Sequence, residues 1–163
     1  MILSTVLQRS MHIVALCATI CLSLAACSNS SSPSDTPTGT VSATVDGASF
    51  TASVATSAVH TGGVLAIAGS DSRGRQIQLR IIGAEATGTY PLGGLTNPNV
   101  ATVTLAPEAS QTYVTSMVDG TGSINLTELT ASKVAGTFSF TASNSARIQK
   151  TVTNGTFNLT ISK

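Results

Sequence analysis

The chain has 163 residues, of which 9% are charged and 4% are aromatic, and it contains no tryptophan. Eight basic residues stand against seven acidic ones, which gives a net charge of +1. Charge this sparse and this balanced offers no basic surface for a phosphate backbone, so we expect no nucleic-acid partner. The length suits one domain with a core of its own.

The N-terminal segment has the layout of an export signal. A short region carrying one positive charge, Arg9, precedes a run of 16 mostly apolar residues, Met11–Ala26. This order of charge, apolar run and small residues is typical of a secretory signal peptide. The run is shorter than the roughly 20 apolar residues that a membrane-spanning helix needs. We therefore expect residues 1–26 to be a cleaved signal peptide.

The end of this run, Leu24-Ala25-Ala26-Cys27, resembles the lipobox of bacterial lipoprotein signal peptides. The resemblance implies cleavage before Cys27, a thioether between its thiol and diacylglycerol, and acylation of the new amine, for example with palmitate. Several acyl chains anchor a protein stably, whereas one chain binds a membrane only marginally. The alternatives are an ordinary signal peptide with a chance cysteine, or a membrane helix.

The residue after the predicted lipidation site bears on where a lipoprotein would be sorted. Ser28, rather than Asp, follows Cys27, which resembles the outer-membrane sorting pattern of lipoproteins. We therefore expect a lipid-anchored protein of the cell envelope, with the outer membrane as its partner through the N-terminal anchor. The periplasmic and surface faces of that membrane both stay open.

Cysteine usage limits the chemistry of the mature protein. Cys17 and Cys21 leave with the signal peptide, and Cys27 carries the lipid. The remaining domain would have no disulfide in an oxidising compartment and must be held by packing and strand pairing. Cysteine nucleophiles and cysteine metal sites are excluded by the same count.

A tether is expected between the anchor and the domain. Residues 28–39 read SNSSSPSDTPTG, a Ser/Pro/Thr-rich stretch without apolar periodicity. Such a segment buries too little apolar surface to offset the entropy lost on ordering. We therefore divide the chain into a signal peptide (1–26), a lipidated cysteine with a flexible tether (27–39) and a domain (40–163).

The domain opens with a predicted hairpin. Apolar and polar residues alternate over Val41–Val45, which is the period of a half-buried strand. Asp46-Gly47 is a two-residue hairpin signal, and Phe50–Val54 continues the alternation on the return.

Short apolar or alternating runs separated by turn residues continue to the C-terminus. Strands are expected at Gly63–Gly69, Ile77–Ile82, Thr89–Leu92, Val100–Leu105, Thr112–Met117, Ser123–Leu129, Lys133–Thr141, Ile148–Val152 and Gly155–Ser162. Turns are expected at residues 71–75 and at Asn154-Gly155. Strands of this spacing with short loops predict an all-β fold, a single antiparallel β-sandwich. A closed or flattened up-and-down β-barrel is the alternative.

One weak recurrence is a Gly-Thr-aromatic step, found at Gly88-Thr89-Tyr90, Gly136-Thr137-Phe138 and Gly155-Thr156-Phe157. Glycine permits a bulge or a tight strand entry. We expect the Thr to face solvent and the aromatic ring to enter the core one pleat later.

These segments together resemble a known family. The residues that carry the resemblance are Thr44–Phe50, Leu65–Gly69, Gly88–Tyr90, Gly122–Leu126, Val134–Phe140 and Asn154–Phe157. Their order after a lipoprotein signal is similar to that of DUF6252, a domain family of unknown function in small bacterial lipoproteins. The resemblance implies an all-β domain and supplies no established activity and no functional residues.

His60 is the one histidine that would remain after cleavage, and its segment predicts a loop or a strand end. A general base must reach its proton donor. Serines are plentiful, so a Ser–His hydrolase stays open as a weak alternative. The sequence has no Gly-x-Ser-x-Gly elbow, and we favour a structural interpretation of His60.

Acidic turn residues are the remaining candidates for chemistry. Asp119-Gly120-Thr121-Gly122 resembles an aspartic-protease loop only superficially, since such sites need two carboxylates sharing a proton. Asp46 and Asp71 could join calcium loops, yet neither lies in a spaced D-x-D-x-D-G pattern. We predict turns at all three positions, with no catalytic residue, metal ligand or cofactor.

Basic residues form one small group. Arg73 and Arg75 flank Gly74 at a predicted turn, and Arg80 lies further along the next strand. We favour a solvated hairpin tip over an anion site.

The sequence predicts an envelope-anchored lipoprotein with a non-enzymatic binding or structural module. Its ligand and its partner are unknown, and an envelope protein and a glycan both stay open as partners. A carrier of small apolar ligands, with a cavity inside a barrel, is the alternative from another class. A hydrolase that uses His60 is the weaker one.

Overall fold

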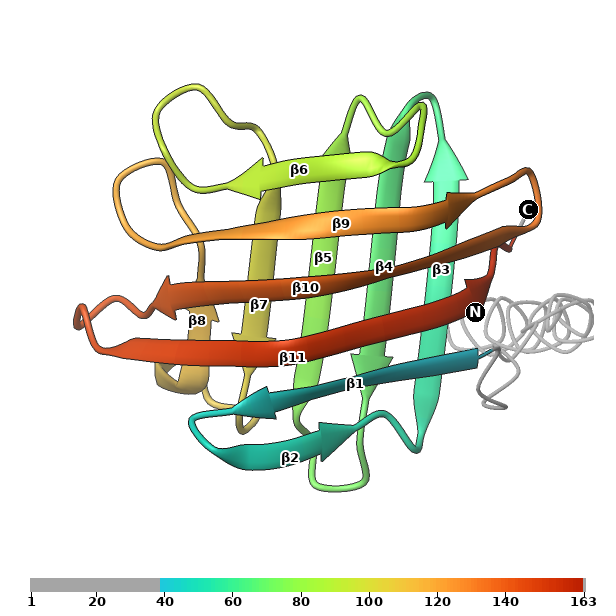
Figure 1. Cartoon of the computed structure of the whole chain (residues 1–163). Coiled ribbons are helices and arrows are strands. Elements are labelled where there is room, and N and C mark those ends of the chain that lie inside the picture. The colour runs from blue at the N-terminus through green and yellow to red at the C-terminus, as the bar shows by residue number, and fades with distance from the viewer. Residues whose placement is uncertain (1–38, 163) are drawn as a thin grey trace, which may run out of the picture. The chain divides into compact units, whose positions relative to one another are not determined.

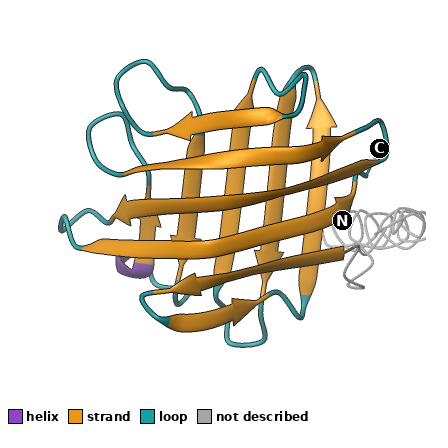
Figure 2. Cartoon of the chain, viewed as in Figure 1, coloured by secondary structure: helices purple, strands orange, loops and turns teal. Residues whose placement is uncertain are grey.

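The computed structural model describes residues 39–162, which are strands joined by short loops (Figures 1 and 2). The strands are β1 (Gly39–Val45), β2 (Ala48–Thr51), β3 (Ala55–Thr61), β4 (Val64–Ser70), β5 (Gln76–Ile82), β6 (Gly88–Leu92), β7 (Val100–Thr104), β8 (Thr112–Val114), β9 (Thr121–Leu129), β10 (Lys133–Ser143) and β11 (Gln149–Thr160). One 3-10 turn, η1 (Ala109–Gln111), precedes β8. The all-β prediction is confirmed.

The strands form one open antiparallel sheet that folds into two layers. The β5 layer contains β3, β4, β5, β7 and β8, and the β10 layer contains β2, β1, β11, β10, β9 and β6. Strands of the two layers run crosswise, as in an orthogonal sandwich (Figure 1). The pair Ser143–Val114 joins the layers at one margin, and a parallel bridge between Val59 and Ser162 joins them at another.

The predicted hairpin at Asp46-Gly47 is confirmed. Val45 pairs with Ala48, so two residues make the turn between β1 and β2. Both have positive φ angles, 46° for Asp46 and 82° for Gly47, as a type I′ turn requires. Asp and Gly are residues that accept this backbone, which is why the dipeptide identified the turn from sequence.

The prediction of a loop at Asn154-Gly155 was wrong. Residues 149–160 form one continuous strand, β11, in place of the two expected strands. The register of β11 shifts by one residue against both β1 and β10 near this point, and Asn154 has a φ of 51°. The dipeptide therefore supplies the left-handed residue of a β-bulge, a conformation that a turn also uses.

Other boundaries also differ from the expectation, among them the return strand of the first hairpin, which ends at Thr51 and not at Val54. Residues 55–61 form strand β3, which was not predicted as a strand, and the predicted strand Thr112–Met117 ends at Val114. Small or polar residues, Thr56, Ala58 and His60, occupy the inward positions of β3, so its apolar alternation is weak. Strand β1 begins at Gly39, inside the predicted tether.

Two copies of the Gly-Thr-aromatic step pair with each other. Gly136 faces Phe157, Thr137 faces Thr156, and Phe138 faces Gly155 across β10 and β11. A Cβ added at Gly155 would overlap the Phe138 ring, so the ring fills the space above the glycine. The predicted role of the aromatic residues as core anchors is confirmed for both phenylalanines, which are at most 3% exposed.

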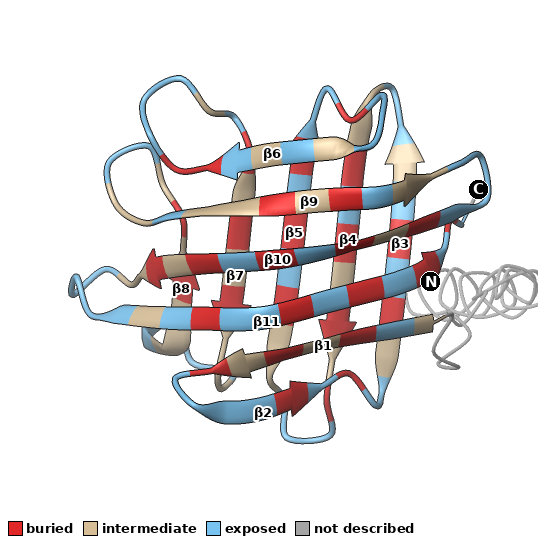
Figure 3. Ribbon diagram, viewed as in Figure 1, coloured by how far each residue is buried: buried red, intermediate tan, exposed pale blue. Residues whose placement is uncertain are grey.

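The core lies between the layers, where buried positions alternate with half-buried or exposed ones along most strands (Figure 3). Phe138 stacks on Phe140 and on Phe157, with ring centroids 6.2 Å apart in both pairs. The outer face of the β10 layer is polar instead. One cross-strand row on it contains Ser42, Thr156, Thr137, Asn125 and Thr89.

We predict that Gly155→Ala lowers the free energy of unfolding by about 1–3 kcal/mol, because the new methyl group overlaps the Phe138 ring. Urea denaturation of residues 28–163 measures the change. Phe138→Leu replaces the ring by a smaller side chain, so Gly155→Ala should cost less in that background than in the wild type. The two substitutions should therefore be coupled by at least about 0.5 kcal/mol. Simple additivity would contradict the packing of the ring on the glycine.

Candidate functional site

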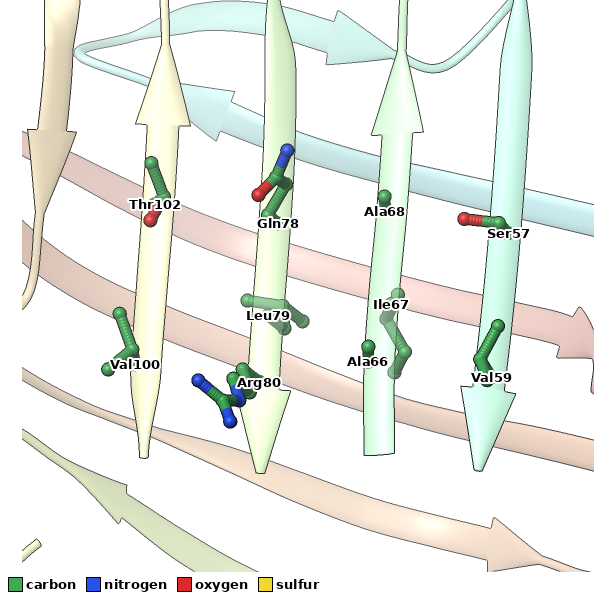
Figure 4. Close-up of a pocket in the computed structure, with 10 residues that line it drawn as sticks. All are labelled: Ser57, Val59, Ala66, Ile67, Ala68, Gln78, Leu79, Arg80, Val100 and Thr102. Atoms are coloured by element: carbon green, nitrogen blue, oxygen red, sulfur yellow. The ribbon is translucent and has the colours of Figure 1, made fainter. Parts of the chain in front are cut away.

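A shallow groove of about 280 Å³ lies on the outer face of the β5 layer (Figure 4). Strands β3, β4, β5 and β7 line it with Ser57, Val59, Ala66, Ile67, Ala68, Gln78, Leu79, Arg80, Val100 and Thr102. Most of these residues are small or apolar. Ligand sites typically combine such a lining with a few polar groups.

The register of the strands creates the groove. Val59, Ala66, Arg80 and Val100 form one cross-strand row, and the next row contains Ala68. Alanine side chains on β4 end close to the sheet, whereas the side chains on β3 and β5 extend beyond them. The two alanines thus form a floor between higher walls.

Arg80 stands at the wall of this groove without an ion pair. The salt bridges within residues 39–162 join other residues: Arg75 to Asp71, Lys133 to Glu128, and Lys150 to Asp46. On the five described strands of the β5 layer, no other Lys or Arg and no Asp or Glu occurs. An unpaired guanidinium offers five hydrogen-bond donors to an acidic group.

The structure separates the three arginines that the sequence placed together. Arg75 belongs to the turn between β4 and β5, where its Nε and Nη2 both lie 2.7 Å from Oδ2 of Asp71. Its Nη2 also donates to the carbonyl oxygen of Ser49, and its guanidinium lies 5.5 Å from the centre of the Phe50 ring. Arg75 therefore ties the β4–β5 turn to β2 and is a structural residue.

Asp71 organises the same turn. Its Oδ1 accepts hydrogen bonds from the backbone N–H groups of Arg73 and Arg75 at 2.9 and 3.0 Å. Burial raises the pKa of this carboxyl, but the hydrogen bonds from Arg75 and from the two N–H groups outweigh it and leave the pKa below the ordinary 3.8. The predicted turn is confirmed, and the carboxylate is occupied by protein donors.

Asp46 is held in a comparable way. Its Oδ1 accepts from the N–H of Thr151 at 2.8 Å, and its Oδ2 lies 2.8 Å from Nζ of Lys150. These two interactions, led by the Lys150 hydrogen bond, lower the pKa of Asp46. The same carboxylate raises the pKa of Lys150. Asp46 therefore fastens the β1–β2 turn to β11.

Neither aspartate has the surroundings of a calcium ligand. Within residues 39–162, no group of three His, Cys, Asp or Glu side chains is close enough to hold a metal ion. Asp119 lies in a turn closed by the hydrogen bond from the Ser116 N–H to its carbonyl oxygen. The prediction of a turn at Asp119 is confirmed.

His60 lies on β3 and faces inward at the rim of the core, in line with Thr56 and Ala58. Its Nε2 is buried and has no hydrogen-bond partner among the described residues. The structure thus brings no serine or carboxylate into a hydrogen bond with this nitrogen. The geometry of a Ser–His pair is not found at Nε2.

A second, more open hollow of about 210 Å³ lies on the outer face of the β10 layer. Hydroxyl side chains line it, chiefly Thr121, Ser139, Thr141, Thr151 and Thr153. No charged side chain contributes to this lining. The hollow therefore offers hydroxyl groups to a ligand but no charged group that would make binding selective.

One family model matches a region that contains both Gly-Thr-Phe steps and the turns described above. The model is the domain of unknown function DUF6252, matched over residues 37–159. The chain belongs to the DUF6252 family. Neither a curated protein nor a solved structure matches this DUF6252 chain.

The predicted lipidation site and lipobox, Leu24, Ala25, Ala26 and Cys27, lie outside the described residues. Within the part that the structure describes, no helix has the length and apolar character needed to cross a membrane. The anchor therefore stays a prediction from sequence.

Sequence reasoning missed the groove, although one signal for it was present. Within the predicted strand Gly63–Gly69, Ala66 and Ala68 alternate with the buried Leu65 and Ile67. Two small residues at period two mark a low strip on one face of a strand. Their alignment with Arg80 depends on the β4–β5 register, which the sequence does not display.

We predict that Asp71→Asn lowers the free energy of unfolding by about 1–3 kcal/mol at neutral pH, because it weakens the contacts to Arg75. A lowered pKa contributes stability that is present above pH 3.8 and is lost as the pH falls through the folded-state pKa. The difference between wild type and variant should therefore shrink below pH 3.8.

Denaturation curves at several pH values check this expectation. Asp119→Asn is the matched control, since no described hydrogen bond or ion pair engages the Asp119 carboxylate, and it should change stability by at most about 0.5 kcal/mol. A difference for Asp71→Asn that is constant down to pH 2 would contradict the argument.

Proposed function

We propose that this DUF6252 protein is a lipoprotein of the cell envelope, anchored in the outer membrane through Cys27, and that its β domain is a non-enzymatic binding module. The signal peptide layout and the lipobox resemblance support the anchor. The observation that supports binding is the unpaired Arg80 at the wall of an apolar groove.

The groove favours a small ligand with an acidic group on an apolar skeleton. The guanidinium of Arg80 would pair with the acid, and Gln78 and Thr102 add polar contacts beside it. Ala66, Ala68 and Val100 would contact the apolar part. No acidic side chain of the described β5-layer strands competes for the arginine.

The tight packing between the layers favours a ligand site on the outer face over an internal cavity of the kind that a carrier would need. A Cβ added at Gly69 would lie 2.8 Å from Cβ of Val41 and 2.9 Å from Cβ of Ala52. At Gly69 the two layers therefore touch with no room for a ligand between them. Within the β10 layer, the Phe138 ring fills the space over Gly155 on the core side.

The anchor is tested by Cys27→Ser. We expect the variant to lose incorporation of labelled palmitate and to leave the membrane fraction, because serine cannot form the thioether. Cys21→Ser is the matched control, since this cysteine would leave with the signal peptide. Unchanged labelling and fractionation of Cys27→Ser would contradict the anchor.

The groove is tested with octanoate as the probe and octanol as its uncharged counterpart. Chemical-shift changes in residues 28–163 should map to Ala66, Ala68 and Val100 for octanoate. Arg80→Gln should weaken octanoate binding about threefold to tenfold, because it removes the charge at the groove wall.

Arg73→Gln is the matched control, since the Arg73 guanidinium makes no ion pair in the described chain. It should leave octanoate binding unchanged. Equal losses in the two variants, or equal binding of octanol and octanoate, would contradict a role for Arg80.

A further inference from the structure

We propose that three exposed apolar side chains at adjacent loop tips, Leu95, Met117 and Val118, insert into the surface of a zwitterionic lipid bilayer. We call these three residues the apolar loop tip. Their exposed fractions are 78%, 61% and 81%, unusually high for large apolar side chains. This inference rests on the proposed lipid anchor at Cys27, which would confine the domain to a membrane.

The two loops lie side by side. Leu95 belongs to the connection between β6 and β7, and Met117 and Val118 belong to the connection between β8 and β9 (Figure 1). The backbones approach closely where the loops leave the domain, since a Cβ added at Gly93 would overlap the carbonyl oxygen of Gly120. The three side chains thus belong to one end of the domain.

Hydrogen bonds fix Met117 and Val118 at the apex of a turn. The N–H of Ser116 donates to the carbonyl oxygen of Asp119 at 2.6 Å, and the N–H of Asp119 donates to Oγ of Ser116 at 2.9 Å. These bonds close the turn beneath its two central residues. Their side chains therefore project from the domain because the turn is folded this way.

The loop of Leu95 is closed in a similar manner. Nδ2 of Asn97 donates to the carbonyl oxygen of Gly93 at 2.7 Å, and the backbone N–H of Asn97 donates to the carbonyl oxygen of Gly94 at 3.3 Å. Leu95 lies within this closed loop and contributes the most exposed leucine of the described chain. Two preformed loops thus present apolar side chains without first having to order.

The lack of basic residues around the apolar loop tip indicates which kind of membrane surface it would enter. Residues 93–99 and 115–120 contain no Lys or Arg, and Asp119 is their one ionisable residue. Basic residues are what draw a surface segment to anionic lipids. With none present, insertion must rest on burying apolar surface, which suits a zwitterionic bilayer.

The tether is long enough for this contact. Eleven residues, 28–38, separate Cys27 from β1 and can span at most about 40 Å. The longest strand, β11, has 12 residues and is also about 40 Å long. The apolar loop tip lies toward the far end of the β10 layer from the start of β1 (Figure 1). A tether as long as the domain lets that end reach the same membrane.

The absence of tryptophan from the chain permits a clean test. Val118→Trp supplies a single reporter in the mature lipidated protein, residues 27–163, reconstituted in vesicles of phosphatidylcholine with brominated acyl chains. We expect bromine to quench this tryptophan strongly. Val54→Trp is the matched control, because Val54 is also an exposed valine, at 43%, but lies in the β2–β3 connection. Its tryptophan should stay unquenched.

A second variant tests the cluster as a unit. Leu95→Ser with Met117→Ser, added to Val118→Trp, should reduce the quenching severalfold while leaving the protein folded, since all three positions are exposed. Quenching at position 118 no greater than at position 54 would overturn the inference. That result would be the outcome if the loops contact a protein partner in place of lipid.

Flotation of the same vesicles separates this inference from the anchor. If the Val118→Trp protein floats and its tryptophan is unquenched, the anchor is kept and membrane insertion of the loops is overturned. If the protein does not float, the anchor fails, and the loops are tested alone by adding residues 28–163 with Val118→Trp to excess vesicles. Quenching in that experiment supports membrane insertion of the loops, and no quenching overturns it.

Discussion

The exchange of glycine and phenylalanine between β10 and β11 is the contact on which the domain depends. Each Gly-Thr-Phe step lies antiparallel to the other, so Phe138 fills the space over Gly155 and Phe157 fills the space over Gly136. The two rings stack between the layers. Residues 39–162 contain no cysteine, so packing of this kind and strand pairing carry the cohesion that disulfides supply elsewhere.

That arrangement leaves the two outer faces with different characters. Threonines of the paired steps point outward into a polar row across the β10 layer. The outer face of the β5 layer has alanine and valine around Arg80. A neutral, hydroxyl-rich face needs no partner to stay soluble, whereas an apolar groove with an unpaired cation is a more selective surface.

Two acidic turn residues are engaged by groups of the protein itself. Asp46 and Asp71 each accept hydrogen bonds from backbone N–H groups and from a basic side chain, and so join turns to neighbouring strands. Arg80, on β5, makes no ion pair with a described residue, and the described strands of its layer have no other Lys or Arg and no Asp or Glu. Arg75, in the turn before β5, is paired because it lies within reach of Asp71.

Local pattern by itself determined the fold class, the β1–β2 hairpin and the inward direction of the phenylalanines, because alternation and turn dipeptides act over a few residues. It failed at β3, where Thr56 and His60 take inward positions, and at Asn154, where a left-handed residue makes a bulge and not a turn. The predicted anchor at Cys27 rests on the sequence alone. Only the tertiary structure placed Arg80 beside the alanines of β4 and brought the loops of Leu95 and Val118 together. Those relations depend on strand register and layer crossing, which join residues far apart in the chain.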